Sequence, residues 1–187
     1  MKKLLLFITV LFFGISTINA QDDASYGYEA GDWVLGGGVT FGSMDMGGVE
    51  TKMNTIAPQV GYFLNENSAL GLNLGLASTD VDGTKVSNTT FGLAYYNYFM
   101  DLGEKTKLWW AVGFGTSSGD SFDDAQTRLG SGIGMNYFMS ENIIVNFQLA
   151  NILQYVKQGD DSSMMFGWEG TINNMSATPT LSVFFKL

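Results

Sequence analysis

The chain has 187 residues, of which 45% are hydrophobic, 14% aromatic and 14% charged, with 24 glycines, two prolines and neither cysteine nor histidine. This length predicts one domain, and the aromatic content argues against a disordered chain. The lack of Cys and His excludes disulfide scaffolds, imidazole bases and most zinc and copper sites. With 18 acidic against nine basic residues, no nucleic-acid partner is expected, because phosphate binding needs a basic surface.

The first 20 residues have the pattern of a secretory signal peptide. Lys2 and Lys3 precede an apolar run from Leu4 to Ile15, and Ala20 offers a cleavage point. The run is shorter than the roughly 20 residues that a membrane helix needs, and no later stretch is long enough either. We therefore expect cleavage of residues 1–20, a short N-terminal periplasmic segment over 21–30, and one folded domain over 31–187.

In the rest of the chain, large apolar residues alternate with small or polar residues, and this period of two is typical of β-strands. In the clearest segment, Leu70, Leu72, Leu74 and Leu76 fall on one face, and Ala, Gly and Asn fall on the other. A face of small and uncharged residues suits the lumen of a narrow barrel and leaves the leucine face for lipid. The same division predicts eight strands, over 33–42, 53–63, 69–77, 89–99, 108–115, 128–137, 145–150 and 181–187.

The predicted connections alternate between short and long. Short turns are expected at 64–67, 101–107 and 140–142, and longer polar loops at 43–52, 78–88, 116–126 and 157–171. Outer-membrane barrels have short periplasmic turns and longer extracellular loops. The pattern thus predicts an all-β fold, an eight-stranded antiparallel up-and-down transmembrane β-barrel with both termini on the periplasmic side.

A Tyr-Phe pair precedes each of the short turns. The three pairs are Tyr62-Phe63, Tyr98-Phe99 and Tyr137-Phe138. Aromatic side chains are enriched at the headgroup level of membrane barrels. We expect these pairs to form the periplasmic half of an aromatic girdle, together with Trp33 and Trp110.

With its signal peptide, eight alternating strands, Tyr-Phe pairs and terminal strand ending Val183-Phe184-Phe185-Lys186-Leu187, the chain resembles the small outer-membrane β-barrel family of Gram-negative bacteria, in particular the OmpX-like and OmpW-like proteins. Leu187 replaces the aromatic last residue usual in that family, and Phe185 lies two positions earlier on the same face. The resemblance implies a monomeric protein of the cell outer membrane, contacts with outer-membrane lipid and lipopolysaccharide, and insertion by the barrel-assembly machinery.

A barrel of eight strands is filled by its own side chains, so a large pore is not expected. Polar residues in the lumen would form a hydrogen-bonded plug or, alternatively, line a narrow conduit. Pro58 and Pro179 would mark bulges or, as in OmpW-like proteins, a local opening between strands. The residues expected in the lumen are Gln59, Asn73, Arg128, Asn136, Asn146, Gln148 and Lys186.

The predicted outer loops carry most of the acidic residues. Their carboxylates could hold calcium or share cations with lipopolysaccharide, or they could simply be solvated. The fourth loop also carries apolar residues, which would extend a strand beyond the membrane or contact an extracellular protein partner. The acidic residues are Asp45, Glu50, Asp80, Asp82, Asp120, Asp123, Asp124, Asp160, Asp161 and Glu169, and the apolar ones Met164, Met165, Phe166 and Trp168.

No catalytic, cofactor-binding or metal-binding residue is predicted. Asp123 and Asp124 are adjacent, so on a strand they face opposite ways and cannot share a proton. Gly36-Gly37-Gly38 lies within an alternating segment and does not form a phosphate loop. The sequence favours a porin-like cell-envelope barrel with a structural or surface-interaction role and no catalytic activity. A narrow OmpW-like conduit for small or apolar solutes, and a soluble periplasmic barrel that binds an apolar ligand, are the alternatives.

Overall fold

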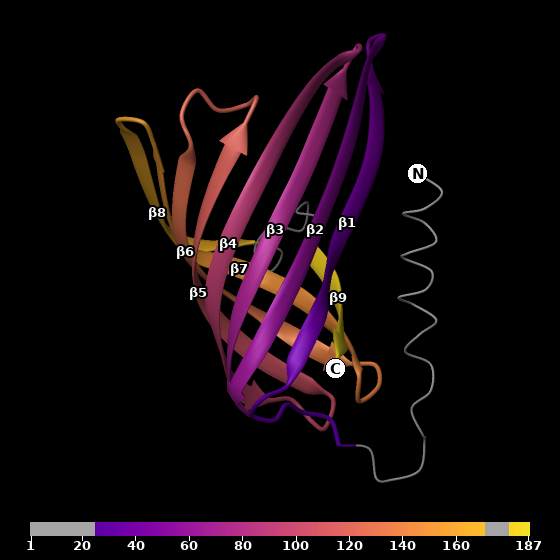
Figure 1. Cartoon of the computed structure of the whole chain (residues 1–187), viewed down its shortest axis with the longest axis vertical. Helices are drawn as coiled ribbons and strands as arrows, with labels where there is room; N and C mark the ends of the chain where they lie inside the picture. Colours follow the sequence, from indigo (N-terminus) through magenta and orange to yellow (C-terminus); the bar gives the residue numbers. More distant parts are fainter. Residues whose placement is uncertain (1–24, 171–179) are drawn as a thin grey trace.

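The computed structural model describes residues 25–170 and 180–187 and contains nine antiparallel β-strands (Figure 1). The predicted signal peptide and Pro179 lie outside these residues. No helix within the described ranges is long and apolar enough to cross a membrane. The strands are β1 (Trp33–Met46), β2 (Val49–Asn65), β3 (Ser68–Val81), β4 (Thr84–Asp101), β5 (Thr106–Gly119), β6 (Gln126–Phe138), β7 (Ile143–Gln158), β8 (Asp161–Gly170) and β9 (Thr180–Lys186).

The nine strands occupy the eight strand positions of one barrel, and we call each position a stave. Each strand from β1 to β7 pairs with the next one in the chain, and β9 pairs with both β7 and β1 to close the sheet. Strands β8 and β9 share one stave, because β8 pairs with the second half of β7 and β9 with its first half. The predicted eight-stranded antiparallel barrel is therefore confirmed, with its last stave split in two.

Among the described residues, the ladder that closes the barrel lies at one end, which we call the base. The ladder between β1 and β9 has four pairs, from Val34↔Lys186 to Gly37↔Val183. Among the described residues, no ladder joins β1 to β8. At the opposite end, which we call the rim, these two strands lie on opposite sides of the molecule in Figure 1. The barrel is thus narrow at the base and flared at the rim.

The two faces of the staves follow the predicted division. On one face of β3, the exposed fractions of Leu70, Leu72 and Leu74 are 41%, 43% and 39%. Ala69, on the opposite face of the same strand, is buried. The leucine face points outward and the small residues point into the lumen. This is opposite to the orientation that a soluble barrel with an apolar ligand inside would require.

The long loops predicted at the rim are wrong for two of the four connections. Strands β1 and β2 are joined by Gly47 and Gly48, and β3 and β4 by Asp82 and Gly83, all four with positive φ. Positive φ at both central residues is typical of a tight two-residue hairpin. The residues around these turns continue the strands. Alternation did not reveal this, because polar residues here interrupt the apolar face that marks the strands elsewhere.

Several staves are longer than a bilayer requires. Strands β2 and β4 have 17 and 18 residues, whereas about 9–11 tilted residues cross the hydrocarbon core. The segment predicted as the fourth loop contains β8, whose Met164 and Phe166 pair with Tyr155 and Leu153 of β7. Its strand extension, one of the two alternatives, is confirmed.

A large ring inside the lumen depends on a glycine opposite to it. Trp109 of β5 is buried and pairs with Gly134 of β6, where an added Cβ would overlap the indole ring and the carbonyl oxygen of Phe147. We expect Gly134→Val to lower the free energy of unfolding by about 1–3 kcal/mol, because overpacking forces strained side chains and backbone shifts. Urea unfolding of the refolded protein measures this loss.

Gly42→Val is the matched control for that substitution, since an added Cβ at Gly42 meets only Met53 at an ordinary contact distance of 3.8 Å. Equal stability of the two variants would contradict the role of Gly134.

Candidate functional site

The base of the barrel is closed by four aromatic rings, which we call the base plug: Tyr28, Phe63, Tyr98 and Phe138. Tyr28 stacks on Phe63, with ring centroids 3.8 Å apart and an interplanar angle of 16°. Its centroid lies 5.0 Å from that of Tyr98 and 5.1 Å from that of Phe138. Because all four rings are at most 9% exposed, they fill the lumen at this end.

The two rings of each Tyr-Phe pair lie on opposite faces of the barrel wall. Tyr62, Phe99 and Tyr137 are 36%, 51% and 43% exposed and point outward, as the predicted girdle requires. Their partners Phe63, Tyr98 and Phe138 point inward, so the assignment of whole pairs to a girdle was wrong for half of the rings. The reason is that neighbouring residues of a strand face opposite sides of a sheet.

Tyr28 reaches the lumen from the segment that precedes β1. Backbone hydrogen bonds tie this segment to β2, since Gly31 N donates to Phe63 O and Phe63 N donates to Asp32 O, both at 2.9 Å. Lys186 Nζ donates to the carbonyl oxygen of Gly27 at 3.1 Å and lies 3.6 Å from Asp32 Oδ2. The N-terminal segment is therefore held across the base of the barrel.

The predicted lumen amides form a hydrogen-bonded chain directly above the rings. Asn136 Nδ2 donates to the hydroxyl oxygens of Tyr28 at 2.6 Å and Tyr98 at 3.1 Å, and Asn146 Nδ2 donates to Asn136 Oδ1 at 2.6 Å. Gln148 Nε2 donates to Asn151 Oδ1 at 2.7 Å. These bonds satisfy polar groups that burial would otherwise penalise, as in the hydrogen-bonded plug considered above.

The other predicted lumen residues do not all join this chain. Gln59 and Asn73 pair across β2 and β3 at the level above it. The basic residues are far apart, because Lys186 lies at the base and the exposed Arg128 near the rim, where its Nε donates to Gln126 Oε1 at 2.6 Å. The two cations therefore form no common site.

Above the plug lies a cavity of about 250 Å³, which we call the lumen cavity. Its walls come from seven of the nine strands, and its floor includes Tyr28, Tyr98 and Asn136. Val34 and Phe184, from β1 and β9, line it where the barrel is closed. The lumen is therefore hollow in its lower half and blocked below.

Pro58 interrupts one ladder without shifting it. The pairing between β2 and β3 has no pair at Ala57 or Pro58, and it continues at Gln59↔Asn73 in the register of Ile56↔Leu76. Opposite Pro58, Gly37 of β1 has a φ of 143° and an added Cβ would overlap the carbonyl oxygen of Ala57. Pro58 therefore causes a local irregularity, and β2 pairs with β1 and β3 both before and after it.

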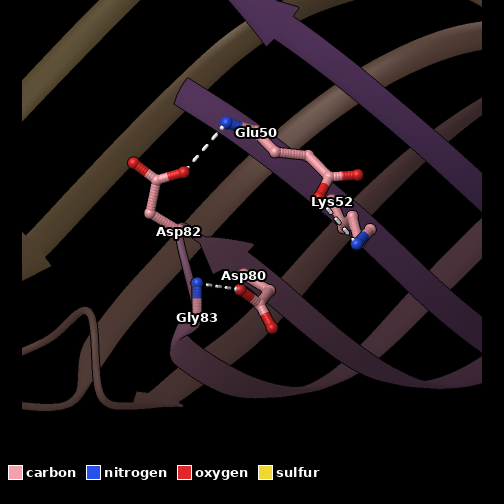
Figure 2. A network of polar contacts seen from close by, with 5 residues as sticks. All are labelled: Glu50, Lys52, Asp80, Asp82 and Gly83. Carbon is pink, nitrogen blue, oxygen red and sulfur yellow. Dashed lines mark hydrogen bonds and ion pairs between the residues drawn. The ribbon is translucent and has the colours of Figure 1, made fainter. Parts of the chain in front are cut away.

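At the rim, several acidic side chains accept hydrogen bonds from backbone N–H groups. Asp80 Oδ1 accepts from Gly83 N at 2.9 Å, and Asp82 Oδ1 accepts from Glu50 N at 3.0 Å (Figure 2). Glu50 also forms an ion pair of 2.9 Å with Lys52. Within the described part of the chain, no three acidic side chains converge as metal ligands would. The carboxylates of Asp80 and Asp82 therefore stabilise the turn between β3 and β4 and its contact with β2.

The environment of Tyr28 predicts a pH dependence. Burial raises the pKa of the Tyr28 phenol, and the hydrogen bonds with Asn136 and Tyr98 offset part of this effect. Above pH 10 the unfolded chain loses a proton that the folded chain retains, so stability should fall by up to about 1.4 kcal/mol per pH unit for this phenol. Denaturant unfolding at pH values from about 9 to 11 should show a shallower decline for Tyr28→Phe. Identical slopes would contradict a raised pKa at this position.

The sequence reasoning missed Tyr28 as a functional residue. The available signal was the Tyr26-Gly27-Tyr28 triplet, two aromatic residues within an otherwise polar segment before the first strand. Tyr26 lies against Phe138 with ring centroids 6.4 Å apart, and Lys105 Nζ lies 4.6 Å from the centre of the Tyr26 ring. Aromatic residues in the segment that precedes the first strand are thus a signal that this segment closes the end of the barrel.

No known family model matches the sequence, and no curated protein matches it. Among solved structures, the chain is similar to the N-terminal β-barrel domain of Pseudomonas aeruginosa OprF, with 16% identity, a TM-score of 0.50, and coverage of 85% of this chain and 98% of that domain.

Two further solved structures are less similar. They are an anion-selective porin from Comamonas acidovorans, with 14% identity and a TM-score of 0.41, and a loop L8 deletion mutant of OmpT, an outer membrane protein of Vibrio cholerae, with 12% and 0.33. The matches cover 86% and 82% of this chain but only 46% and 49% of those chains, so this chain spans about half their length. The OprF domain is thus the comparison that informs the fold.

Proposed function

We propose that this chain, which has the fold of the small outer-membrane β-barrels, is an integral protein of the outer membrane with a structural or surface-interaction role and no catalytic activity. The observation that carries the proposal is its outward face. Leu35, Leu72, Phe91 and Val112 are exposed there although they are large and apolar. A water-soluble protein rarely exposes a contiguous apolar band of this kind, whereas a barrel in lipid requires one.

The sealed base supports a role other than general diffusion. The base plug and the Asn136 chain occupy the lumen where a continuous pore would have to pass. The four buried rings narrow the lumen at the base, which supports a role other than the passage of hydrated solutes. The conduit remains the second candidate, favoured by the lumen cavity above the plug.

The extended rim supports surface interaction. Staves longer than the hydrocarbon core project their hairpins beyond it. Met46, Met164 and Phe166, which are 68%, 70% and 79% exposed, lie on these projecting parts. Flexible and aromatic side chains exposed beyond the membrane are suited to contact with lipopolysaccharide or with an extracellular protein.

The proposal is tested by carbonate extraction of cell envelopes followed by electrophoresis with and without boiling. We expect the protein in the membrane pellet and a heat-dependent shift in mobility, as for a closed barrel that resists detergent. Recovery in the soluble periplasm would contradict the proposal. Planar-bilayer recordings then separate the two candidates, because a sealed barrel gives no steady conductance and a conduit does.

A further inference from the structure

The side chains that line the lumen leave an open cavity between them. Its volume of about 250 Å³ corresponds to roughly eight water molecules at about 30 Å³ each. It is smaller than the roughly 300–1,000 Å³ of pockets for drug-sized ligands. From its size and the chemistry of its walls, we infer that it binds a small uncharged polyhydroxy solute of about the size of a monosaccharide.

One wall of the cavity presents two amides that have no hydrogen-bond partner among the described residues. Gln59 on β2 and Asn73 on β3 lie opposite each other, and both line the cavity. Each carboxamide has two N–H donors and a carbonyl acceptor. A solute with several hydroxyl groups can pair with all of these, because each hydroxyl both donates and accepts.

The facing wall presents acceptors. Asn146 and Gln148 of β7 use their NH₂ groups to donate to Asn136 Oδ1 and Asn151 Oδ1. Their own carbonyl oxygens accept no hydrogen bond from another described residue, and both side chains line the cavity. These oxygens require donors from a ligand, which hydroxyl groups supply.

The remaining lining determines what the cavity excludes. None of the described residues that line it carries a charge at neutral pH. A charged solute would lose hydration there without gaining a counter-charge, which is strongly unfavourable. Tyr96 and Phe184 contribute aromatic rings to the wall, which suit the C–H faces of a sugar ring and disfavour a fully polar ion.

Glycines keep the amides and the rings in place. Asn73 Oδ1 lies where an added Cβ at Gly92 would be, and an added Cβ at Gly71 would lie 2.9 Å from Tyr96 Cε2. Small residues at these two positions therefore set both the orientation of Asn73 and the width of the cavity.

The test is a titration of the refolded, full-length mature protein in detergent micelles with D-glucose, followed by NMR of the side-chain NH₂ groups. We expect saturable shifts of the Gln59 and Asn73 signals. The double variant Gln59→Leu/Asn73→Leu should bind about tenfold more weakly, since it loses at least two hydrogen bonds. Glucose 6-phosphate should also bind at least about tenfold more weakly to the unaltered protein, because of its charge.

Asn54→Leu is the matched control, because Asn54 is an exposed amide of β2 outside the cavity. It should leave glucose binding unchanged. The inference is overturned if the NH₂ signals of Gln59 and Asn73 do not shift in the unaltered protein, which would mean that the cavity holds water only, or if they shift no more than that of Asn54. The measurement on the unaltered protein decides this even if the double variant does not fold.

Discussion

Tyr28→Ala is expected to lower the free energy of unfolding of the barrel by about 3–5 kcal/mol, the loss typical for removing a large buried ring. Tyr28 is 4% exposed, stacks on Phe63 at 3.8 Å and accepts a hydrogen bond from Asn136 at 2.6 Å. Removal of its ring leaves a cavity among the other three rings of the base plug. Urea unfolding of the protein refolded in detergent or lipid vesicles measures the loss.

Tyr28→Phe separates the ring from its hydroxyl. It keeps the stack on Phe63 and removes one hydrogen bond, so a loss of only about 0.5–1.5 kcal/mol is expected. If the Ala variant is as stable as the Phe variant, the N-terminal segment does not close the barrel. The same pair of variants bears on conduction, because a barrel sealed by this ring should conduct ions in planar bilayers after Tyr28→Ala and remain silent after Tyr28→Phe.

Leu74→Arg is expected to cost about 2–4 kcal/mol when the protein is folded in lipid vesicles, the value for arginine at the midplane of a bilayer. Leu74 lies on the outward face near the middle of β3, 39% exposed. A guanidinium there would be surrounded by acyl chains. Equilibrium unfolding from vesicles gives the difference from the unaltered protein.

Ser43→Arg is the matched control, since Ser43 is exposed and lies on the outward face of β1, in phase with Trp33, near the rim. Ten residues at about 3.4 Å each, tilted by about 40°, place it about 26 Å from Trp33 along the barrel axis, at the rim edge of a hydrophobic band about 25 Å tall. Its expected cost is about 0–1 kcal/mol. Equal small effects of the two substitutions would show that water, and not lipid, surrounds the outward face.

The candidate site could be predicted only in part. Strand phase correctly put Asn136, Asn146 and Gln148 in the lumen, because a period of two assigns each residue to a face. It could not show that Asn136 meets Tyr28, 108 positions away in the chain. It also put Arg128 and Lys186 on the same face without showing that they lie at opposite ends of the barrel.

Alternation in the sequence by itself determined the fold class, the stave count and the outward direction of the leucine face, because each of these depends on local periodicity and composition. Only the tertiary structure decided how the base of the barrel is closed. Closure at the base depends on the register of β9 against β1 and on the entry of Tyr28 among Phe63, Tyr98 and Phe138. These contacts join distant segments, and no local pattern encodes which ring will meet which. The lumen cavity has the same origin, since its walls converge from seven strands.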